Sequence, residues 1–168
     1  AFKIVGSHGD AQLGGVDFDQ RVVKLALDSY AKQGGSVAAL QKNPRALLKL
    51  TRECQRAKES LSTMTSQVME IRDEDFTLKR TVFEQATEDL IQRGLRPIDA
   101  VLAQTQLTID DIDYVVLAGG TSHIPAIQDA LKARFGDDKI LKSLDPLQAI
   151  VKGAAIQAAL LSTSPLQK

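Results

Sequence analysis

The stretch YVVLAGGTSHIP, residues 114–125, decides the fold. Its first five residues are apolar and include two valines, a composition that predicts a short strand buried on both faces. Two glycines end that strand, Thr121 or Ser122 can cap a helix, and Pro125 suits a first helical turn. The helix that follows has an apolar stripe at helical spacing, made by Ile127, Ala130, Leu131 and Phe135. A strand, a glycine turn and a helix in this order are typical of an α/β protein.

The glycine turn is a candidate anion or nucleotide site. A helix N-terminus presents backbone N–H groups and the positive end of the helix dipole, and glycines let a ligand approach the backbone closely. The alternative is an ordinary loop whose glycines allow tight packing. Similar turns at residues 14–15 and 145–146 also precede predicted helices. If the fold brings the three turns together, they would form a cradle for a phosphate or nucleoside.

Composition excludes several classes of protein. The 168 residues suffice for one domain with a hydrophobic core. Lys plus Arg and Asp plus Glu both number 21, so bulk charge supports neither nucleic-acid nor anionic-membrane binding. Aromatic residues make up only 4%, which argues against a platform for stacking bases. The single cysteine, Cys54, cannot form an internal disulfide, which favours a cytoplasmic or other reducing intracellular compartment.

Neither a membrane span nor a signal peptide is predicted. Lys152, Gly153 and Gln157 interrupt the longest apolar stretch, residues 149–161, which is too short to cross a bilayer. The chain opens with strand-like residues 2–5 and no signal-peptide pattern. We therefore expect a piece whose natural N-terminus lies upstream.

Turn and cap signals predict the remaining elements. Strands are expected at residues 1–7, 67–71, 75–78 and 140–141, the middle two forming a hairpin. Five further helices are expected. The first starts at the cap Asp17 and ends at 34–35, the second starts at 43–44, and the third runs from 81 to 94. The fourth starts at Pro97, and the last runs from 148 to 161 after the cap Asp145. The small residues around Gly153 predict that the last helix lies close to a sheet or another helix. The order predicts a sheet-bearing base (1–32 and 96–162), an inserted helical and hairpin subdomain (33–95) and a tail (163–168).

Motifs for several chemistries are missing from the sequence. His8 and His123 have no serine nucleophile at motif spacing, and no ligand spacing for a metal occurs. Neither GxxxxGK[ST] nor GxGxxG is present, and the acidic residues 108–113 lack the glycine of a calcium loop. Cys54 lies in the apolar stripe of its helix and is interpreted as a small buried residue. Lys58, near the end of that helix, is either a charge for the cradle or a solvated lysine that complements the helix dipole.

Four segments together are more specific than any one glycine turn. They are GDAQLGGVDFDQR (9–21), CQRAKESLS (54–62), VLAGGTSHIP (116–125) and the run from DP to GAA (145–155). These segments resemble GDTHLGGEDFDxR, CERAKxxLS, VLVGGSTRIP and NPDEAVAxGAA of the seventy-kilodalton heat-shock chaperones, the DnaK type. Their order and spacing nearly match, and the resemblance covers about residues 2–161.

The resemblance implies an actin-like ATPase (ribonuclease-H-like) fold of two lobes around a nucleotide cleft. This chain is similar to lobe II, a mixed sheet with helices plus an inserted upper subdomain. By carry-over, Gly15 would approach the phosphates, Lys58 and Ser62 the ribose or adenine, and residues 119–121 the nucleotide. The full set of implied cofactor-binding residues is Gly14, Gly15, Gln55, Lys58, Glu59, Ser62, Gly119, Gly120, Thr121 and His123. The family's catalytic carboxylates and phosphate-binding lysine lie upstream of Ala1, so no catalytic or metal-binding residue is assigned here.

The resemblance also implies a function in protein folding and the stress response. ATP or ADP with Mg²⁺ would bind the full-length protein, and whether this piece alone binds nucleotide is left open. ATPase activity is expected only in the full-length chain. The implied partners are the upstream lobe, unfolded polypeptide clients, and J-domain and nucleotide-exchange co-chaperones, with neither nucleic acid nor membrane.

Departures from the family's pattern keep a second interpretation open. Gln55 stands where the family has glutamate, Glu59 where many members have arginine, and His123 where the family has arginine. Leu147 and Gln148 replace an aspartate and a glutamate. The alternative is a divergent, non-hydrolysing chaperone-like protein that acts as an interaction module or co-chaperone. A sugar kinase or filament protein would share the strand–glycine–helix element but not the first two motifs.

Overall fold

The computed structural model describes residues 3–141 and 145–163. The chain divides into two compact units, residues 1–105 and 106–168, which are described separately. Unit 1 contains α1 (Gly15–Lys32), α2 (Val37–Gln41), α3 (Pro44–Ser60), β1 (Ser66–Ile71), β2 (Glu74–Lys79) and α4 (Arg80–Thr105). Unit 2 contains a 3₁₀ turn, η1 (Gly120–His123), then α5 (Pro125–Phe135) and α6 (Ala149–Thr163). No helix in the described ranges is long and apolar enough to cross a membrane.

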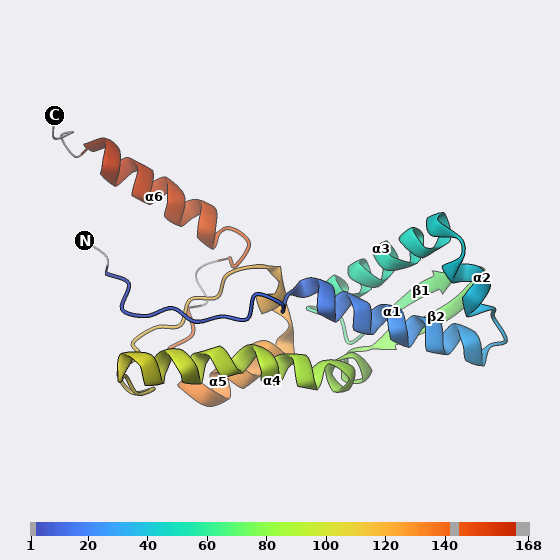
Figure 1. The fold of residues 1–168 in the computed structure, drawn as a ribbon, viewed down its shortest axis with the longest axis horizontal. Coiled ribbons are helices and arrows are strands. Elements are labelled where there is room, and N and C mark those ends of the chain that lie inside the picture. Colours follow the sequence, from blue (N-terminus) through green and yellow to red (C-terminus); the bar gives the residue numbers. More distant parts are fainter. Residues whose placement is uncertain (1–2, 142–144, 164–168) are drawn as a thin grey trace. The chain divides into compact units, whose positions relative to one another are not determined.

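The core of unit 1 lies between its helices and the β-hairpin. The two strands pair antiparallel from Ser66↔Lys79 to Ile71↔Glu74, and α1, α3 and α4 pack against them (Figure 1). The side chains that fill this core are almost fully buried: Phe18, Val22, Ala26, Leu50, Cys54, Leu78 and Phe83. Their burial removes apolar surface from water and stabilises the packing of the three helices on the hairpin.

Several predicted boundaries are confirmed. Asn43 caps α3, its Oδ1 accepting from the Ala46 N–H at 3.2 Å, and a proline follows in the first turn. The hairpin forms where expected, and its two turn residues, Arg72 and Asp73, have φ of 49° and 69°. Positive φ at both positions is the geometry of the tight hairpin turns that match strand twist. Cys54 is fully buried, as its place in the apolar stripe of α3 predicts.

The prediction of two helices over residues 81–104 is wrong, because α4 is a single helix that begins at Arg80 (Figure 1). Gly94 and Pro97 both lie inside it, although proline cannot donate to the carbonyl of Arg93. Tertiary contacts outweigh this cost. The Leu13 side chain packs against Gly94, and the chain near residue 6 lies so close to the last turns of α4 that a Cβ there would have no room.

The strand predicted within residues 114–118 is also wrong in extent. Val115 forms a single parallel bridge with Ile140, and the side chains of Tyr114 and Val116 are 66% and 53% exposed. A strand buried on both faces needs pairing along its edges and packed layers over both faces, and among the described residues this run has one bridge and exposed side chains. The predicted strand 140–141 reduces to this bridge, and residues 3–7 are unpaired in the structure. The beginning of that first predicted strand, residues 1–2, lies outside the described residues.

Three predicted helix starts need correction. Gly14 caps α1, and Asp17 lies in the first turn, where its carboxylate accepts from the Gly14 N–H. Residues 121–122 belong to η1, and Ile124 is the cap of α5. Asp145 does accept from a nearby backbone N–H, that of Leu147, but residues 146–148 form a turn and α6 begins at Ala149. Before α1 and α6 a carboxylate accepts from a nearby backbone N–H, whereas Ile124 makes no side-chain cap bond at α5.

The last helix differs from its predicted packing. Residues 150–162 of α6 are exposed in the structure, including the apolar Ile150, Ile156 and Leu160. Nothing lies within 4 Å of where a Cβ of Gly153 would stand, so the predicted close packing around this glycine is not seen among the described residues. The division into base, inserted subdomain and tail stays a prediction, and nearly all of the tail lies outside the described residues.

Candidate functional site

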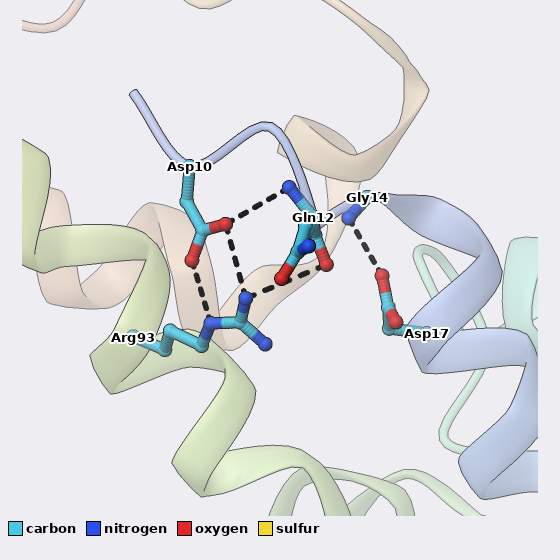
Figure 2. Close-up of polar contacts among 5 residues, drawn as sticks. All are labelled: Asp10, Gln12, Gly14, Asp17 and Arg93. Carbon is cyan, nitrogen blue, oxygen red and sulfur yellow. Dashed lines mark hydrogen bonds and ion pairs between the residues drawn. The ribbon is translucent and has the colours of Figure 1, made fainter. Parts of the chain in front are cut away.

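The turn that precedes α1 is tied to α4 by a two-pronged ion pair (Figure 2). Arg93 Nε lies 2.6 Å from Asp10 Oδ2, and Arg93 Nη2 lies 3.0 Å from Asp10 Oδ1. The same Nη2 also donates to the Gln12 carbonyl at 3.5 Å, and Asp10 Oδ1 accepts from the Gln12 N–H at 2.9 Å. The guanidinium therefore holds both a side chain and a backbone carbonyl of the turn.

This ion pair shifts the protonation equilibria of its two members. The hydrogen bond from Arg93 lowers the pKa of Asp10, and the Gln12 N–H lowers it further. The carboxylate in turn raises the pKa of Arg93. Both groups are therefore charged throughout the physiological pH range.

The first turn of α1 has backbone N–H groups that are free to bind a ligand at the N-terminus of the helix. The Gly14 N–H donates to Asp17 Oδ2 at 2.8 Å, and the Asp17 N–H donates to the Gly14 carbonyl at 3.1 Å. In the part of the chain that the structure describes, the N–H groups of Gly15 and Val16 have no acceptor. Nothing lies within 4 Å of where a Cβ of Gly14 would stand. A ligand anion can thus approach this backbone closely.

Lys58 of α3 lies beside this turn. Its Nζ is 2.7 Å from Asp19 Oδ1 and donates to the Gly15 carbonyl at 3.3 Å. The side chains of Lys58 and Asp19 are only 11% and 14% exposed. The lysine therefore fastens α3 to the first turns of α1 and neutralises a carboxylate close to Gly15.

The other residues assigned on α3, and Ser62 just after its end, lie near Lys58. Gln55 and Glu59 are exposed, and Gln55 Nε2 donates to Glu59 Oε1 at 3.0 Å. Ser62 follows the end of the helix and its N–H donates to the Glu59 carbonyl. Positions three and four apart lie on one side of a helix, so the structure brings these four residues together.

In unit 2 the glycine turn meets the turn that precedes α6. Gly119 has φ 85° and ψ 153°, and its N–H donates to the Pro146 carbonyl at 3.0 Å. Ser122 Oγ donates to the Gly119 carbonyl at 2.7 Å. A Cβ on Gly120 would lie 3.6 Å from a methyl group of Leu147. Two of the three predicted turns therefore converge within this unit, while the turn at residues 14–15 belongs to unit 1.

His123 lies at the edge of this pair of turns. Its Nε2 is 3.8 Å from Asp145 Oδ1, and that nitrogen is buried without a hydrogen-bond partner in the described residues. Thr121 is half-buried in the same turn, whereas Gly119 and Gly120 are exposed. The imidazole is thus in reach of a carboxylate to which it can bind when protonated.

Neither a thiol nucleophile nor a metal site accompanies these turns. Burial raises the pKa of Cys54 to about 12, with the charges of Asp19 and Glu53 adding to the effect. Among the residues that the structure describes, no group of three or more His, Cys, Asp or Glu side chains could hold a metal ion.

Sequence reasoning missed the ion-pair partners in unit 1. Asp10 and Asp19 both lie inside the segment 9–21, whose charges could have marked them as structural. Arg93 has no local signal, because 83 positions separate it from Asp10. Only the packing of the turn on α4 reveals their pairing.

Comparison with protein families agrees with these features. A family model described as "Hsp70 protein" matches residues 1–167. Members of this family are chaperones that bind ATP, and membership implies an actin-like ATPase fold, with which the mixture of helices and a small sheet is compatible. The match spans nearly the whole chain, so the chain belongs to the Hsp70 family and is part of a chaperone nucleotide-binding domain.

Proposed function

We propose that this chain is lobe II of a DnaK-type nucleotide-binding domain and supplies half of an ATP or ADP cleft. The observation that carries the proposal is the glycine turn at the start of α1. It has two open N–H groups at Gly15 and Val16, bare backbone at Gly14, and Lys58 alongside. This donor set fits a phosphate group.

Two carboxylates near the turn would oppose an anion if they were free. Asp17 is engaged by the Gly14 N–H, and Asp19 is engaged by Lys58. The charge of Asp19 is therefore paired with that of Lys58, whereas Asp17 keeps its negative charge and is held by the Gly14 N–H. The described residues provide no metal-ligand cluster of their own, so Mg²⁺ would be held mainly through the phosphates and groups outside this chain.

The remaining assigned residues support contact with the nucleoside. Lys58 of α3 and Ser62, which follows the helix, would face ribose or adenine, and Gln55 and Glu59 lie on the same face of α3 as Lys58. In unit 2, exposed glycines in residues 119–120 leave the backbone open to a flat ligand, and His123 offers a ring for stacking.

The alternative is a divergent chaperone-like protein that does not hydrolyse ATP. Two contacts favour it. Gln55 and Glu59 bind each other, which competes with any bond to a ribose, and Nε2 of His123 is turned toward Asp145. Under this alternative the chain acts through protein contacts as an interaction module or co-chaperone.

Nucleotide binding would serve to switch polypeptide binding in a neighbouring domain. The proposed partners are the other lobe, unfolded clients, and J-domain and nucleotide-exchange co-chaperones. A reducing intracellular compartment suits the buried thiol of Cys54.

A titration of the full-length protein with ATP and Mg²⁺ tests the proposal. We expect saturable binding in calorimetry and no hydrolysis by the isolated chain. Failure to bind at millimolar nucleotide would contradict the ATPase proposal and leave the interaction module. Magnesium-dependent turnover by the pure isolated chain would contradict the assignment to a single lobe.

A further inference from the structure

We propose that Arg93 is a positioning residue for the phosphate-facing turn, which it holds in its binding geometry through Asp10. The inference rests on the proposed function, because it concerns the same turn. Neither Arg93 nor Asp10 would touch the nucleotide in this proposal. Their contribution is to keep the backbone of residues 10–15 fixed before a ligand arrives.

The contacts reach the turn at two points. Arg93 binds both carboxylate oxygens of Asp10 and also donates to the carbonyl of Gln12 (Figure 2). A planar guanidinium that binds a carboxylate with two N–H groups fixes its direction as well as its distance. The turn cannot rotate about Asp10 without breaking at least one of these bonds.

The backbone carries this constraint to the glycines. The Asp10 carbonyl accepts from the Leu13 N–H at 3.3 Å, which closes a tight turn over residues 10–13. Gly14 follows at once and is bonded to Asp17 within the first turn of α1. A continuous series of hydrogen bonds and adjoining residues therefore runs from Arg93 to the N–H groups of Gly15 and Val16.

A second contact holds the same turn against the same part of α4. The Leu13 side chain lies over Gly94, where a Cβ would stand 3.5 Å from its Cδ2. Arg93 and Gly94 are neighbours, so the ion pair and the apolar contact meet on adjacent residues. This explains why α4 continues through a glycine that the sequence predicts as its end.

The physical benefit is preorganisation. Glycine-containing turns have a large conformational freedom, and ordering one on ligand binding opposes affinity. A turn that is already ordered in the free protein avoids that cost and binds its ligand more tightly. The effect should be specific to the part of the nucleotide that the turn contacts.

The test compares MgADP with adenosine, which lacks phosphates, on the full-length protein and its Arg93→Ala variant. Because the ion pair is partly exposed, we expect MgADP affinity to fall about three- to tenfold. Adenosine affinity should change less than twofold. Amide hydrogen exchange of residues 12–16 should accelerate. The control is Arg96→Ala, an exposed arginine on the same helix with no ion pair among the described residues, and it should alter neither affinity.

Arg93→Lys keeps the charge but loses the planar fork, so its MgADP affinity should lie between those of the wild type and Arg93→Ala. It replaces the alanine variant if that variant does not fold. MgADP affinity within twofold of the wild type in the tested variant, or an equal loss of adenosine affinity, would overturn the positioning role alone. A wild-type protein that binds no MgADP would overturn the proposed function, and this inference with it.

Discussion

Lys58 Nζ lies 2.7 Å from Asp19 Oδ1, and this pair joins α3 to α1 next to the backbone of Gly15. Both side chains are nearly buried, so the pair forms part of the packing between the two helices. The lysine that the family resemblance assigns to the nucleoside thus has a structural partner within the chain. The structural role of Lys58 and its proposed role in nucleotide binding can be separated by experiment.

Removal of one member of the pair should destabilise unit 1. In Lys58→Met the carboxylate of Asp19 stays nearly buried without its cation, and we expect unfolding free energy to fall by about 2–3 kcal/mol. The double variant Lys58→Met/Asp19→Leu should lose less than the sum of the single variants. Urea unfolding measures each value, and Lys49→Met, whose side chain is 70% exposed, is the control with an effect below about 0.5 kcal/mol. Strict additivity would show that the two charges do not interact.

Lys58 should also affect nucleotide affinity. We expect Lys58→Ala in the full-length protein to weaken ATP binding by ~1–2 kcal/mol, the contribution of one charge-assisted hydrogen bond. Calorimetry at a temperature well below the unfolding transition separates this loss from the loss of stability. Lys49→Ala, on the same helix, should bind as the wild type does. Equal affinities in the two variants would leave Lys58 with its structural role alone.

Local signals in the sequence predict α3 and the β-hairpin of unit 1. Asn43 followed by proline marks the start of α3, and the apolar stripe that includes Cys54 identifies its buried face. The hairpin follows from two short strands around the turn at Arg72 and Asp73. These features depend on residues close in sequence, whose preferences agree with the packing.

Features that depend on distant residues could not be predicted. α4 passes through Gly94 and Pro97 because Leu13 and the chain near residue 6 pack against it. The pairing of Arg93 with Asp10 likewise joins residues that are far apart in the sequence. The apolar run 114–118 forms a strand only if another strand pairs along it, and the described residues offer Val115 one bridge. Local pattern alone cannot show whether such partners exist.

The thiol of Cys54 should be unreactive in the folded protein. Burial and nearby carboxylates raise its pKa from 9.0 to about 12, so on the order of one thiol in ten thousand is ionised at pH 8. Alkylation by iodoacetamide should therefore be slow in buffer and fast in denaturant. Cys54→Ser should cost about 1–3 kcal/mol, because a hydroxyl would replace sulfur among apolar neighbours, and Cys54→Ala should cost less. Rapid labelling of the native protein would contradict this account.

Stability should depend on Asp10 in acid. Arg93 lowers the pKa of this carboxyl below its ordinary value of 3.8, so the folded state binds its proton more weakly than the unfolded state. Its stabilising effect is complete above about pH 4 and is lost as the pH falls through the folded pKa. The difference in unfolding free energy between the wild type and Asp10→Asn should hence shrink below pH 4. A difference that stays constant from pH 7 to pH 2 would show that ionisation of Asp10 contributes nothing.

Gly119 and Gly120 should respond differently to the same substitution. Gly119 has φ 85° and ψ 153°, a conformation essentially restricted to glycine, while nothing lies within 4 Å of where its Cβ would stand. Gly119→Ala should therefore lose about 1–3 kcal/mol through backbone strain alone. Gly120 lacks a positive φ and its Cβ would make an ordinary 3.6 Å contact with Leu147, so Gly120→Ala should lose much less. Thermal unfolding of both variants measures the contrast. Equal losses would mean that the turn adopts another backbone conformation in solution, and the hydrogen bond from Gly119 to Pro146 would then have to be abandoned as the link between the two turns.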